Sequence, residues 1–448
     1  MSDYNYDVII IGAGPGGYET ALKCRKNNLS VCLIEKQEVG GTCLNRGCIP
    51  TKALLHGSEK LHELKDLEVL GIRTGDVSFD YGVLAQYKDN VVARLRGNVE
   101  MMLKKSGVVV KKGYGSLQDN HSVEVNDECI TAENIILATG SRPLLPPVKG
   151  IENTITSDEF LALNSMEEEN WVIIGGGVIG MEAAFILGKL GKKVTVIEMM
   201  PSILPGVDSG ILKWLNRSIK KLGIKVLTSA RVLEVGTDRI WYQYKDKTEE
   251  LPFDRCLAAA GRRNNISDIG LEKAGVSRER NRIPVDEHMR TNVDNIYAIG
   301  DITGIKQLAH VATYQGDVAL ANILGKDECA DYHVIPACIF VDPVISTVGL
   351  TEKELQEKGV EYETASSNAG ANGKALLSQK GEGTVLIYYG REDKVILGAQ
   401  MICENSSEMI NEVSVLMKKG GTIDDIVHTV HPHPTIGEIV KDACEKAC

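Results

Sequence analysis

The apolar and polar positions follow the same order in two separate stretches of the chain, residues 7–35 and 171–198. Each stretch opens with a short apolar run, passes through a glycine-rich turn into a helix-like pattern, and closes with an apolar run that ends in glutamate. Short apolar runs bounded by turn residues are typical of buried strands, and a helix between two such strands is typical of a βαβ unit. We therefore predict two βαβ units with parallel strands, in an α/β protein.

The turn in each unit has the spacing GxGxxG, and a glutamate follows at the same offset. The first glycine of such a turn permits the bend, the second lets the backbone approach a pyrophosphate, and the third lets helix and strand pack closely. The helix N-terminus then faces the phosphates, and the carboxylate can accept hydrogen bonds from a ribose. One such turn could lack a ligand, but two in the same context predict two dinucleotide sites. Their residues are Gly12, Gly14, Gly17 and Glu35 in the first unit and Gly175, Gly177, Gly180 and Glu198 in the second.

The glutamate of the second unit bears on the choice of cofactor. A carboxylate at Glu198 favours a free 2′-hydroxyl and repels a 2′-phosphate. The residues after it, Met199, Met200 and Pro201, supply no arginine for a phosphate. We therefore predict NAD rather than NADP at the second site, although a solvated strand end would also explain a glutamate here.

Two later segments also run from an apolar strand into a polar turn. ENIILATGSRP (133–143) places Thr139 and Gly140 at the end of a strand, and TNVDNIYAIGD (291–301) ends in Asp301. An aspartate there could bind ribityl or ribose hydroxyls of a flavin nucleotide, or it could be only a helix N-cap. We assign these three residues to the cofactor sites, together with Gly261 in the turn AAAGRRNN (258–265).

Length, composition and charge narrow the class of protein. The chain has 448 residues, of which 43% are hydrophobic and 25% charged, and its formal net charge is −11. This length predicts three or four domains of an ordinary globular protein. No basic block suggests a nucleic-acid partner, and no apolar run reaches the roughly 18 residues of a membrane helix. The N-terminus enters a strand without the features of a signal peptide, so we expect neither secretion nor a membrane partner.

The cysteines do not have the pattern of a disulfide framework, because their number, eleven, is odd and most are scattered. We expect the scattered ones to be small core residues in a reducing compartment, which predicts a cytoplasmic protein. These are Cys24, Cys32, Cys129, Cys256, Cys338 and Cys403.

Cys43 and Cys48 are the exception, since they lie close together in the run GGTCLNRGCIPTKALL. Two cysteines at this spacing could form a structural disulfide, could be unrelated thiols, or could exchange electrons with a neighbouring flavin. The glycines around them allow a tight bend, and Pro50 predicts the start of a helix whose N-terminus would stabilise a thiolate at Cys48. Their position directly after the first dinucleotide unit favours the redox pair.

With these features the chain resembles the two-dinucleotide-binding flavoprotein disulfide reductases, the class I pyridine nucleotide-disulfide oxidoreductases. The likeness covers almost the whole length and is most specific in four segments, GGTCLNRGCIPTKALL, GGGVIGMEAA, TNVDNIYAIGD and HPHPTIGE. Within the family the chain is most similar to the lipoamide dehydrogenase branch. Lys52 after the cysteine pair, the LAH pattern in QLAHVATYQG, and a histidine where related reductases carry tyrosine all favour this branch.

The resemblance implies a fold and a set of partners. It implies two Rossmann-like domains that bind FAD and NAD, and an α+β domain that forms a homodimer. The expected boundaries are 1–145 for the FAD domain, 146–265 for the NAD domain, 266–331 for a central domain that completes the FAD site, and 332–448 for the interface domain. The implied partner is a lipoyl-bearing protein of a 2-oxoacid dehydrogenase or glycine-cleavage complex.

The resemblance also implies a mechanism, the oxidation of protein-bound dihydrolipoamide. His433, oriented by Glu438 and supplied by the partner subunit, would deprotonate a substrate thiol. The thiolate would attack Cys43, and Cys48 would leave beside the flavin. Lys52 and Glu182 would pair near the flavin. The simpler interpretations are that His433 is a surface histidine, Lys52 a solvated lysine and Glu182 an ordinary helical glutamate. No metal site is predicted, because His431 and His433 lack further ligands nearby in the sequence.

One departure from the family pattern keeps alternatives open. The chain ends in IVKDACEKAC, where Cys444 and Cys448 could form a second thiol pair that carries electrons to thioredoxin, glutathione or mercuric ion, or could be two ordinary helix cysteines. A flavin transhydrogenase or NADH oxidase without thiol chemistry, or a non-catalytic flavoprotein subunit, would leave Cys43 and Cys48 idle.

Overall fold

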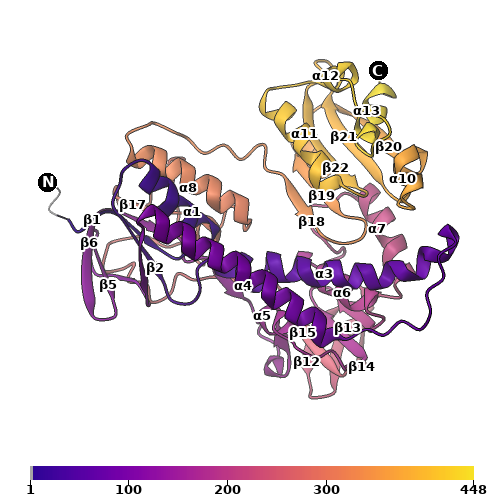
Figure 1. The fold of residues 1–448 in the computed structure, drawn as a ribbon, viewed down its shortest axis with the longest axis horizontal. Coiled ribbons are helices and arrows are strands. Elements are labelled where there is room, and N and C mark those ends of the chain that lie inside the picture. The colour runs from indigo at the N-terminus through magenta and orange to yellow at the C-terminus, as the bar shows by residue number, and fades with distance from the viewer. Residues whose placement is uncertain (1–3, 448) are drawn as a thin grey trace.

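The structure of the chain, a computed structural model, describes residues 4–447. Three groups of elements surround three sheets, one built on the N-terminal strand, one on the second βαβ unit, and one near the C-terminus (Figure 1). The long helices α3 (Cys48–Glu63) and α4 (Tyr81–Ser106) join the first two groups, because α4 packs on α1 (Pro15–Lys26) and α3 packs on α6 (Val178–Lys189).

The first sheet forms around β1 (Tyr6–Ile11), which pairs in parallel with β2 (Val31–Glu35) on one side and β6 (Glu128–Leu137) on the other. Alternate residues of β1 enter two cores, Val8 and Ile10 on the side of α1, Ile9 and Ile11 on the other. Both faces of the strand are covered, which explains its unbroken apolar run. The remaining strands are β3 (Val109–Lys112), β4 (Ser116–Leu117), β5 (Ser122–Val125) and β17 (Ile296–Ala298), in the order β3-β2-β1-β6-β5-β4 with β17 also beside β6.

The segment 266–331 adds to this first sheet. Its strand β17 pairs in parallel with the second half of β6, and its helix α8 (Ala309–Ile323) lies against α1. Ile266, Ile269 and Leu271 are buried in the core below the sheet, so this segment shares the core of residues 1–145.

The second sheet repeats the arrangement with the order β11-β10-β9-β15-β8, all parallel. Trp171 and Ile173 of β9 face α6, whereas Val172 and Ile174 face an antiparallel meander that covers the opposite side. Each fully buried isoleucine here stabilises the fold by about 1.5–3 kcal/mol. The strands are β8 (Ile155–Thr156), β9 (Asn170–Ile174), β10 (Lys193–Ile197), β11 (Lys225–Leu227) and β15 (Arg255–Ala258), and the meander is β12 (Arg231–Val235), β13 (Arg239–Tyr244) and β14 (Lys247–Pro252).

Two short antiparallel strands, β7 (Ser141–Pro143) and β16 (Arg262–Asn264), connect the first two groups. Smaller helices fill the links around them. These are α2 (Gly41–Arg46), α5 (Ser157–Leu161), α7 (Ser209–Lys221) and the 3₁₀ turns η1 (Leu64–Leu70), η2 (Ile151–Asn153) and η3 (Gly300–Thr303).

The third sheet is antiparallel in the order β18-β19-β22-β21-β20, with helices packed against it. The two Rossmann-like sheets, the first parallel apart from the antiparallel strands β4 and β5, and this α+β unit confirm the predicted fold class. The strands are β18 (Ala337–Ile339), β19 (Ile345–Gly349), β20 (Tyr362–Asn368), β21 (Thr384–Gly390) and β22 (Ile396–Ile402). The helices are α9 (Glu352–Glu357), α10 (Gly373–Leu377), α11 (Ser406–Lys418), α12 (Ile423–His428) and α13 (Glu438–Glu445), with the 3₁₀ turn η4 (Ala369–Ala371).

Candidate functional site

One large cavity, of about 1680 Å³, lies where the three groups of elements meet. Both glycine turns, the cysteine pair and strand β18 contribute to its walls. Most residues predicted from the sequence line it, namely Gly12, Gly14, Gly17, Glu35, Cys43, Cys48, Lys52, Thr139, Gly140, Gly175, Gly177, Glu182, Glu198, Gly261 and Asp301. Gly180 lies just behind its wall, and His433 and Glu438 are not part of it.

The two glycine turns have the same geometry. A side chain at Gly17 would place its Cβ 1.9 Å from the carbonyl oxygen of Gly12, and one at Gly180 would come within 2.0 Å of Gly175. Neither position accepts a side chain, because helix and strand touch there. A Cβ at the second glycine, Gly14 or Gly177, would meet nothing within 4 Å. The backbone at these two glycines therefore faces open space, which suits a pyrophosphate.

The glutamate that ends each unit folds back on its own turn. Glu35 accepts a hydrogen bond from the amide of Ala13 at 2.7 Å, and Glu198 accepts one from Gly176 at 2.6 Å. Each carboxylate is fixed beside its glycine turn and lines the cavity, as binding a ribose requires.

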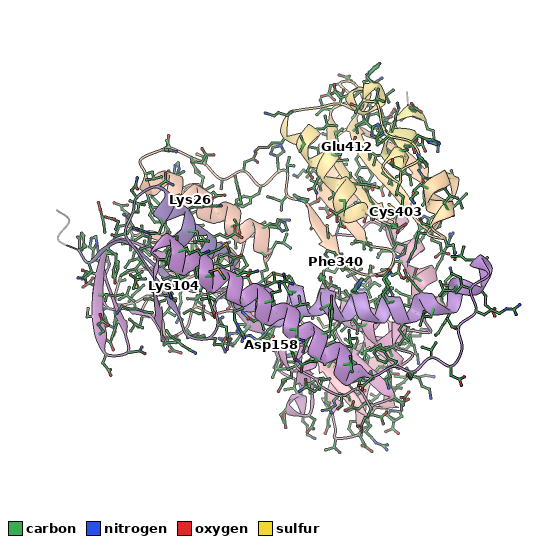
Figure 2. The ribbon with its side chains drawn as sticks, in the orientation of Figure 1. Lys26, Lys104, Asp158, Phe340, Cys403 and Glu412 are labelled. Carbon is green, nitrogen blue, oxygen red and sulfur yellow. A yellow bond between two sulfur atoms is a disulfide. The ribbon has the colours of Figure 1, made fainter. Side chains whose placement is uncertain are left out.

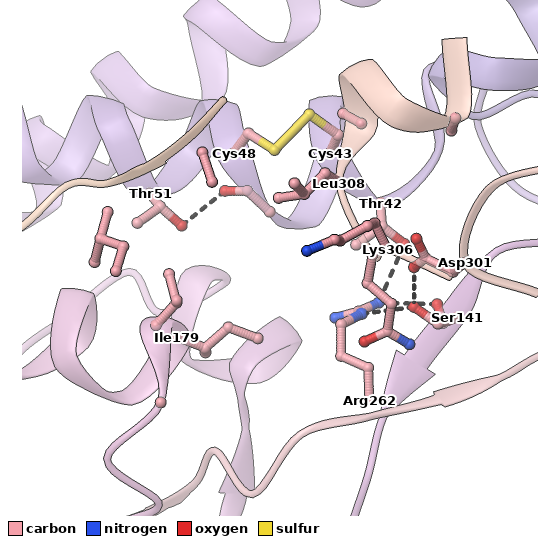
Figure 3. A pocket seen from close by; sticks show the side chains of 18 of the residues that line it. Thr42, Cys43, Cys48, Thr51, Ser141, Ile179, Arg262, Asp301, Lys306 and Leu308 are labelled. Carbon is pink, nitrogen blue, oxygen red and sulfur yellow. Dashed lines mark hydrogen bonds between the residues drawn. A yellow bond between two sulfur atoms is a disulfide. The ribbon is translucent and has the colours of Figure 1, made fainter. Parts of the chain in front are cut away.

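The cysteine pair lies directly on the first glycine turn. Cys43 and Cys48 form a disulfide, with their Cα atoms 4.7 Å apart. Gly41, with φ at +58°, comes so close to Gly14 that a side chain there would place its Cβ 2.6 Å from the Cα of Gly14. The sulfur atoms face the cavity between α2 and α3 (Figure 3).

Helix α3 begins at Cys48 rather than at Pro50, the start that the sequence predicted. Proline fits inside a first turn, because the amides of that turn need no partner within the helix. Cys48 therefore lies at the positive end of the helix dipole, which stabilises a thiolate.

Lys52 and Glu182 form an ion pair across the cavity. The Lys52 Nζ lies 3.0 Å from both oxygens of Glu182, whose side chain is buried. Glu182 also accepts the amide of Phe340 at 3.0 Å, and the Lys52 ammonium lies 4.2 Å from the centre of the Phe340 ring. Phe340 lies between the lower and upper groups of elements (Figure 2), so this cluster joins α3, α6 and the segment after β18.

Arg262 is a cavity residue that the sequence analysis did not single out. Its guanidinium donates to the hydroxyl and the carbonyl of Ser141, at 2.7 and 2.8 Å, and reaches the hydroxyl of Thr42 at 3.5 Å (Figure 3). Ser141 in turn donates to Asp301. Asp301 is therefore not a helix N-cap; the residue before η3 is Ile299 and the one before α8 is Leu308. Burial lowers the pKa of Arg262.

The pair His433 and Glu438 lies outside the cavity, on the C-terminal unit. The His433 Nδ1 lies 2.9 Å from Glu438 Oε1, and the imidazole is 78% exposed. The amide of Thr435, followed by the bond from His433, lowers the pKa of Glu438, which therefore stays ionised. The pair is assembled and open to solvent, so it can act on a group brought to it from outside its own subunit.

Two of the six cysteines predicted to be core residues, Cys129 and Cys338, are not fully buried. Cys129 is exposed rather than a core residue, because it lies at the hairpin end of β6, beyond the covered part of the sheet. Cys338 is half-buried on the cavity wall. Cys24, Cys32, Cys256 and Cys403 are buried, and burial raises the pKa of each thiol to about 12.

The alternative of a thiol pair between Cys444 and Cys448 falls on a residue, Cys448, that lies outside the described residues; Cys444 is buried on α13. Away from the cavity, Glu287, His288 and Cys329 bring three possible metal-ligand atoms within 4.8 Å of one another. This group was not predicted from the sequence, because its members come from two separate loops.

Comparison with known proteins places these features in a family. Residues 6–316 match the family described as pyridine nucleotide-disulphide oxidoreductase, and residues 335–444 match its dimerisation domain. The chain belongs to this family, whose cofactors are the FAD and NAD predicted from the sequence. None of the helices in residues 4–447 combines the length and apolar character that crossing a membrane requires.

Individual relatives are similar over nearly the whole chain. It is 37% identical to the dihydrolipoyl dehydrogenase of Geobacillus stearothermophilus over 98% of this chain and 96% of that protein. It is 39% identical to the dihydrolipoyl dehydrogenase of Chlamydia pneumoniae over 97% and 95%. Among solved structures, the HOCl-induced flavoprotein disulfide reductase RclA of Escherichia coli superposes with a TM-score of 0.89, at 28% identity, covering 98% of this chain and 99% of that one.

Proposed function

We propose that the protein oxidises dihydrolipoamide carried by a partner protein to lipoamide, through the Cys43–Cys48 disulfide, FAD and NAD. The observation that carries the proposal is the disulfide itself, which lies on the first glycine turn and faces the same cavity as both dinucleotide turns. The likeness to dihydrolipoyl dehydrogenases over almost the full length supports the choice of substrate.

In the proposed reaction His433 takes a proton from one substrate thiol. The thiolate attacks the Sγ of Cys43, so that the Cys43–Cys48 bond breaks and Cys48 leaves as a thiolate. The second substrate thiol then attacks the mixed disulfide, which releases lipoamide and leaves both cysteines reduced. His433, held by Glu438, gives the first proton to the departing Cys43 sulfur and takes up the proton of the second substrate thiol, so the reaction ends with Cys43 as a thiol, Cys48 as a thiolate and His433 protonated.

The helix dipole at the start of α3 stabilises the Cys48 thiolate. FAD, when bound, accepts the electron pair of the reduced cysteines and supplies a hydride to NAD. We assign FAD to the first site, held by Gly12, Gly14, Gly17, Glu35, Thr139, Gly140 and Asp301, with Lys52 and Glu182 beside it. We assign NAD to the second site, held by Gly175, Gly177, Gly180, Glu198 and Gly261.

The position of the His433–Glu438 pair supports a homodimer as the active unit. The pair lies outside the cavity that holds the disulfide of its own chain, on the part that matches a dimerisation domain. We propose that each chain supplies this pair to the other, and that the domains divide near residues 145, 265 and 331. We place the protein in the cytoplasm, together with a lipoyl-bearing 2-oxoacid dehydrogenase or glycine-cleavage protein.

A substrate panel tests the proposal. The holoenzyme is assayed on dihydrolipoamide with NAD or NADP as acceptor, and on glutathione disulfide, oxidised thioredoxin and mercuric ion with NADH or NADPH as donor. We expect turnover of dihydrolipoamide with NAD as acceptor. Turnover of thioredoxin or mercuric ion without activity on dihydrolipoamide would overturn the assignment.

A further inference from the structure

The imidazole of His431 is held in an unusual way, two residues before His433. Its Nδ1 lies 3.0 Å from the carbonyl oxygen of Thr429, and its Nε2 lies 3.0 Å from Oε1 of Glu412. The side chain is only 8% exposed, so water cannot readily replace either partner. A carbonyl oxygen and an ionised carboxylate both accept hydrogen bonds, whereas a neutral imidazole has only one N–H to donate. With Glu412 ionised, both contacts are satisfied together only when both ring nitrogens carry a proton.

The extra proton could belong to Glu412 instead, which would then donate to Nε2. Model carboxyl groups titrate about two pH units below model imidazoles, so a proton shared between the two resides on the ring. This geometry is that of an imidazolium at His431 with Glu412 as its counter-ion. Glu412 stands on α11, as Figure 2 shows, whereas His431 belongs to the loop between α12 and α13.

His433 has the opposite arrangement. Its Nδ1 faces Glu438, but within residues 4–447 no hydrogen-bond partner is placed at its Nε2, and its ring is open to solvent. A neutral ring with the proton on Nδ1 satisfies this geometry and leaves a lone pair on Nε2. The two histidines of the HPHP segment thus differ in their contacts: both ring nitrogens of His431 face acceptors, as in a fixed cation, whereas the Nε2 of His433 is open to solvent and can take a proton.

The fixed cation acts on the pair beside it in two ways. It fastens the loop 429–437 to α11, and its charge is among those that lower the pKa of Glu438. On α13, Lys441 donates at 3.4 Å to the same Thr429 carbonyl that the ring contacts, and Asp442 is the further charged group that His431 influences. Glu412 is the carboxylate that bonds directly to the ring.

We propose that His431 is a positioning residue, an imidazolium that is paired with Glu412 and holds the loop 429–437 so that His433 is presented as the base. This inference rests on the proposed function, because it assigns His431 a task in that reaction. Among the described residues of the loop 429–437, His431 is the one that forms an ion pair with α11, through Glu412.

Nuclear magnetic resonance tests the protonation directly and does not depend on turnover. The oxidised holoenzyme is labelled with ¹⁵N-histidine, and the ring signals of His431 are assigned with His431→Gln. Both ring nitrogens of His431 are expected in the protonated range at neutral pH, while His433 shows one protonated and one unprotonated nitrogen. A neutral His431 ring would overturn the proposal.

Steady-state kinetics test whether the His431–Glu412 pair positions His433. Glu412→Gln removes the counter-ion, and Glu408→Gln, an exposed carboxylate one turn away on α11, is the matched control. Misplacing a catalytic group by about 1 Å can cost roughly 100-fold. We therefore expect kcat/KM for dihydrolipoamide to fall about 10- to 100-fold in Glu412→Gln, with the fall in kcat, and to stay unchanged in the control.

Two further readouts separate positioning from a general loss of structure. Reduction of ferricyanide by NADH, which needs no thiol base, should be unchanged in Glu412→Gln. In His431→Gln, which loses the ring's positive charge but keeps Glu412, the acid limb of the kcat/KM profile should move to higher pH, because loss of a nearby positive charge favours protonation of the base. Equal losses in both assays, or an unmoved profile, would defeat the inference. Failure of the wild-type enzyme to oxidise dihydrolipoamide would instead defeat the proposed function, and the NMR result would still stand.

Discussion

Glu35 and Glu198 occupy the same place in the two halves of the molecule: each carboxylate accepts the amide of the residue after the first glycine, at 2.7 and 2.6 Å. Each also accepts the amide two residues further along the chain, Gln37 at 2.8 Å and Met200 at 2.6 Å. The internal repeat is therefore a repeat of side-chain geometry as well as of strand order. A dinucleotide at either site meets a carboxylate that is already oriented.

Replacing Glu198 with glutamine should weaken the preference for NAD. The amide oxygen can still accept from Gly176, but the amide nitrogen cannot accept from Met200, and the charge that repels a 2′-phosphate is lost. We expect the ratio of kcat/KM for NAD to that for NADP to fall about tenfold, a difference of about 1.4 kcal/mol. Steady-state kinetics with both cofactors measure it, and Glu169→Gln, at a surface ion pair, is the control. An unchanged ratio would show that Glu198 does not select the cofactor.

Replacing Cys43 with serine should abolish oxidation of dihydrolipoamide. Without the Cys43 sulfur no mixed disulfide can form, so we expect activity to fall by at least about 1,000-fold. NADH-dependent reduction of ferricyanide should remain, because it does not pass through the cysteine pair. Cys129→Ser, which changes an exposed thiol outside the cavity, is the matched control. A Cys43→Ser enzyme that still oxidises dihydrolipoamide would favour a flavoprotein in which the pair is idle.

Both dinucleotide sites and the cysteine pair could be predicted from the sequence, because the motifs that indicate them lie within short segments. The glycine spacing, the terminal glutamates and the neighbouring cysteines lie within short segments, and the structure brings them to one cavity. The alternating burial of β1 and β9 follows from their apolar runs, since parallel strands are covered on both faces.

The site contacts that could not be predicted from the sequence join segments that are far apart along the chain. Arg262 meets Ser141 only because β16 pairs with β7, and Phe340 meets Lys52 only because β18 lies beside α3 and α6. The bond between His431 and Glu412 also joins two elements that no periodic pattern connects. The exposure of Cys129 was mispredicted because apolar neighbours do not show where a strand leaves the core.

Replacing Glu182 with glutamine should destabilise the protein. The side chain is buried and serves both Lys52 and the amide of Phe340. Glutamine can keep the second contact but not the charge, so we expect the free energy of unfolding to fall by about 1–3 kcal/mol. Urea titration of the holoenzyme at fixed protein concentration measures it. Glu63→Gln, near the surface, should cost less than about 1 kcal/mol; equal losses in the two variants would contradict the buried role of Glu182.

The lowered pKa of Glu438 predicts how the His433 pair responds to acid. The ordinary value is 4.5, and the value in the folded protein is lower. A carboxyl with a depressed pKa stabilises the folded state fully above its unfolded pKa, and this contribution is lost as pH falls through the folded pKa. The urea midpoint of wild type should therefore exceed that of Glu438→Gln above about pH 5, and the gap should close in stronger acid. A gap that widens as pH falls would contradict the assignment.

The most direct test of the account is an anaerobic titration of the oxidised holoenzyme with dithionite, read by the flavin spectrum. A disulfide between Cys43 and Cys48 that lies against the flavin should take up the first two electrons. We predict that one two-electron equivalent produces a long-wavelength band from the Cys48 thiolate beside the oxidised flavin, and that this band is absent in Cys48→Ser. Bleaching of the flavin from the first addition, with no such band, would contradict the claim that these two cysteines relay electrons.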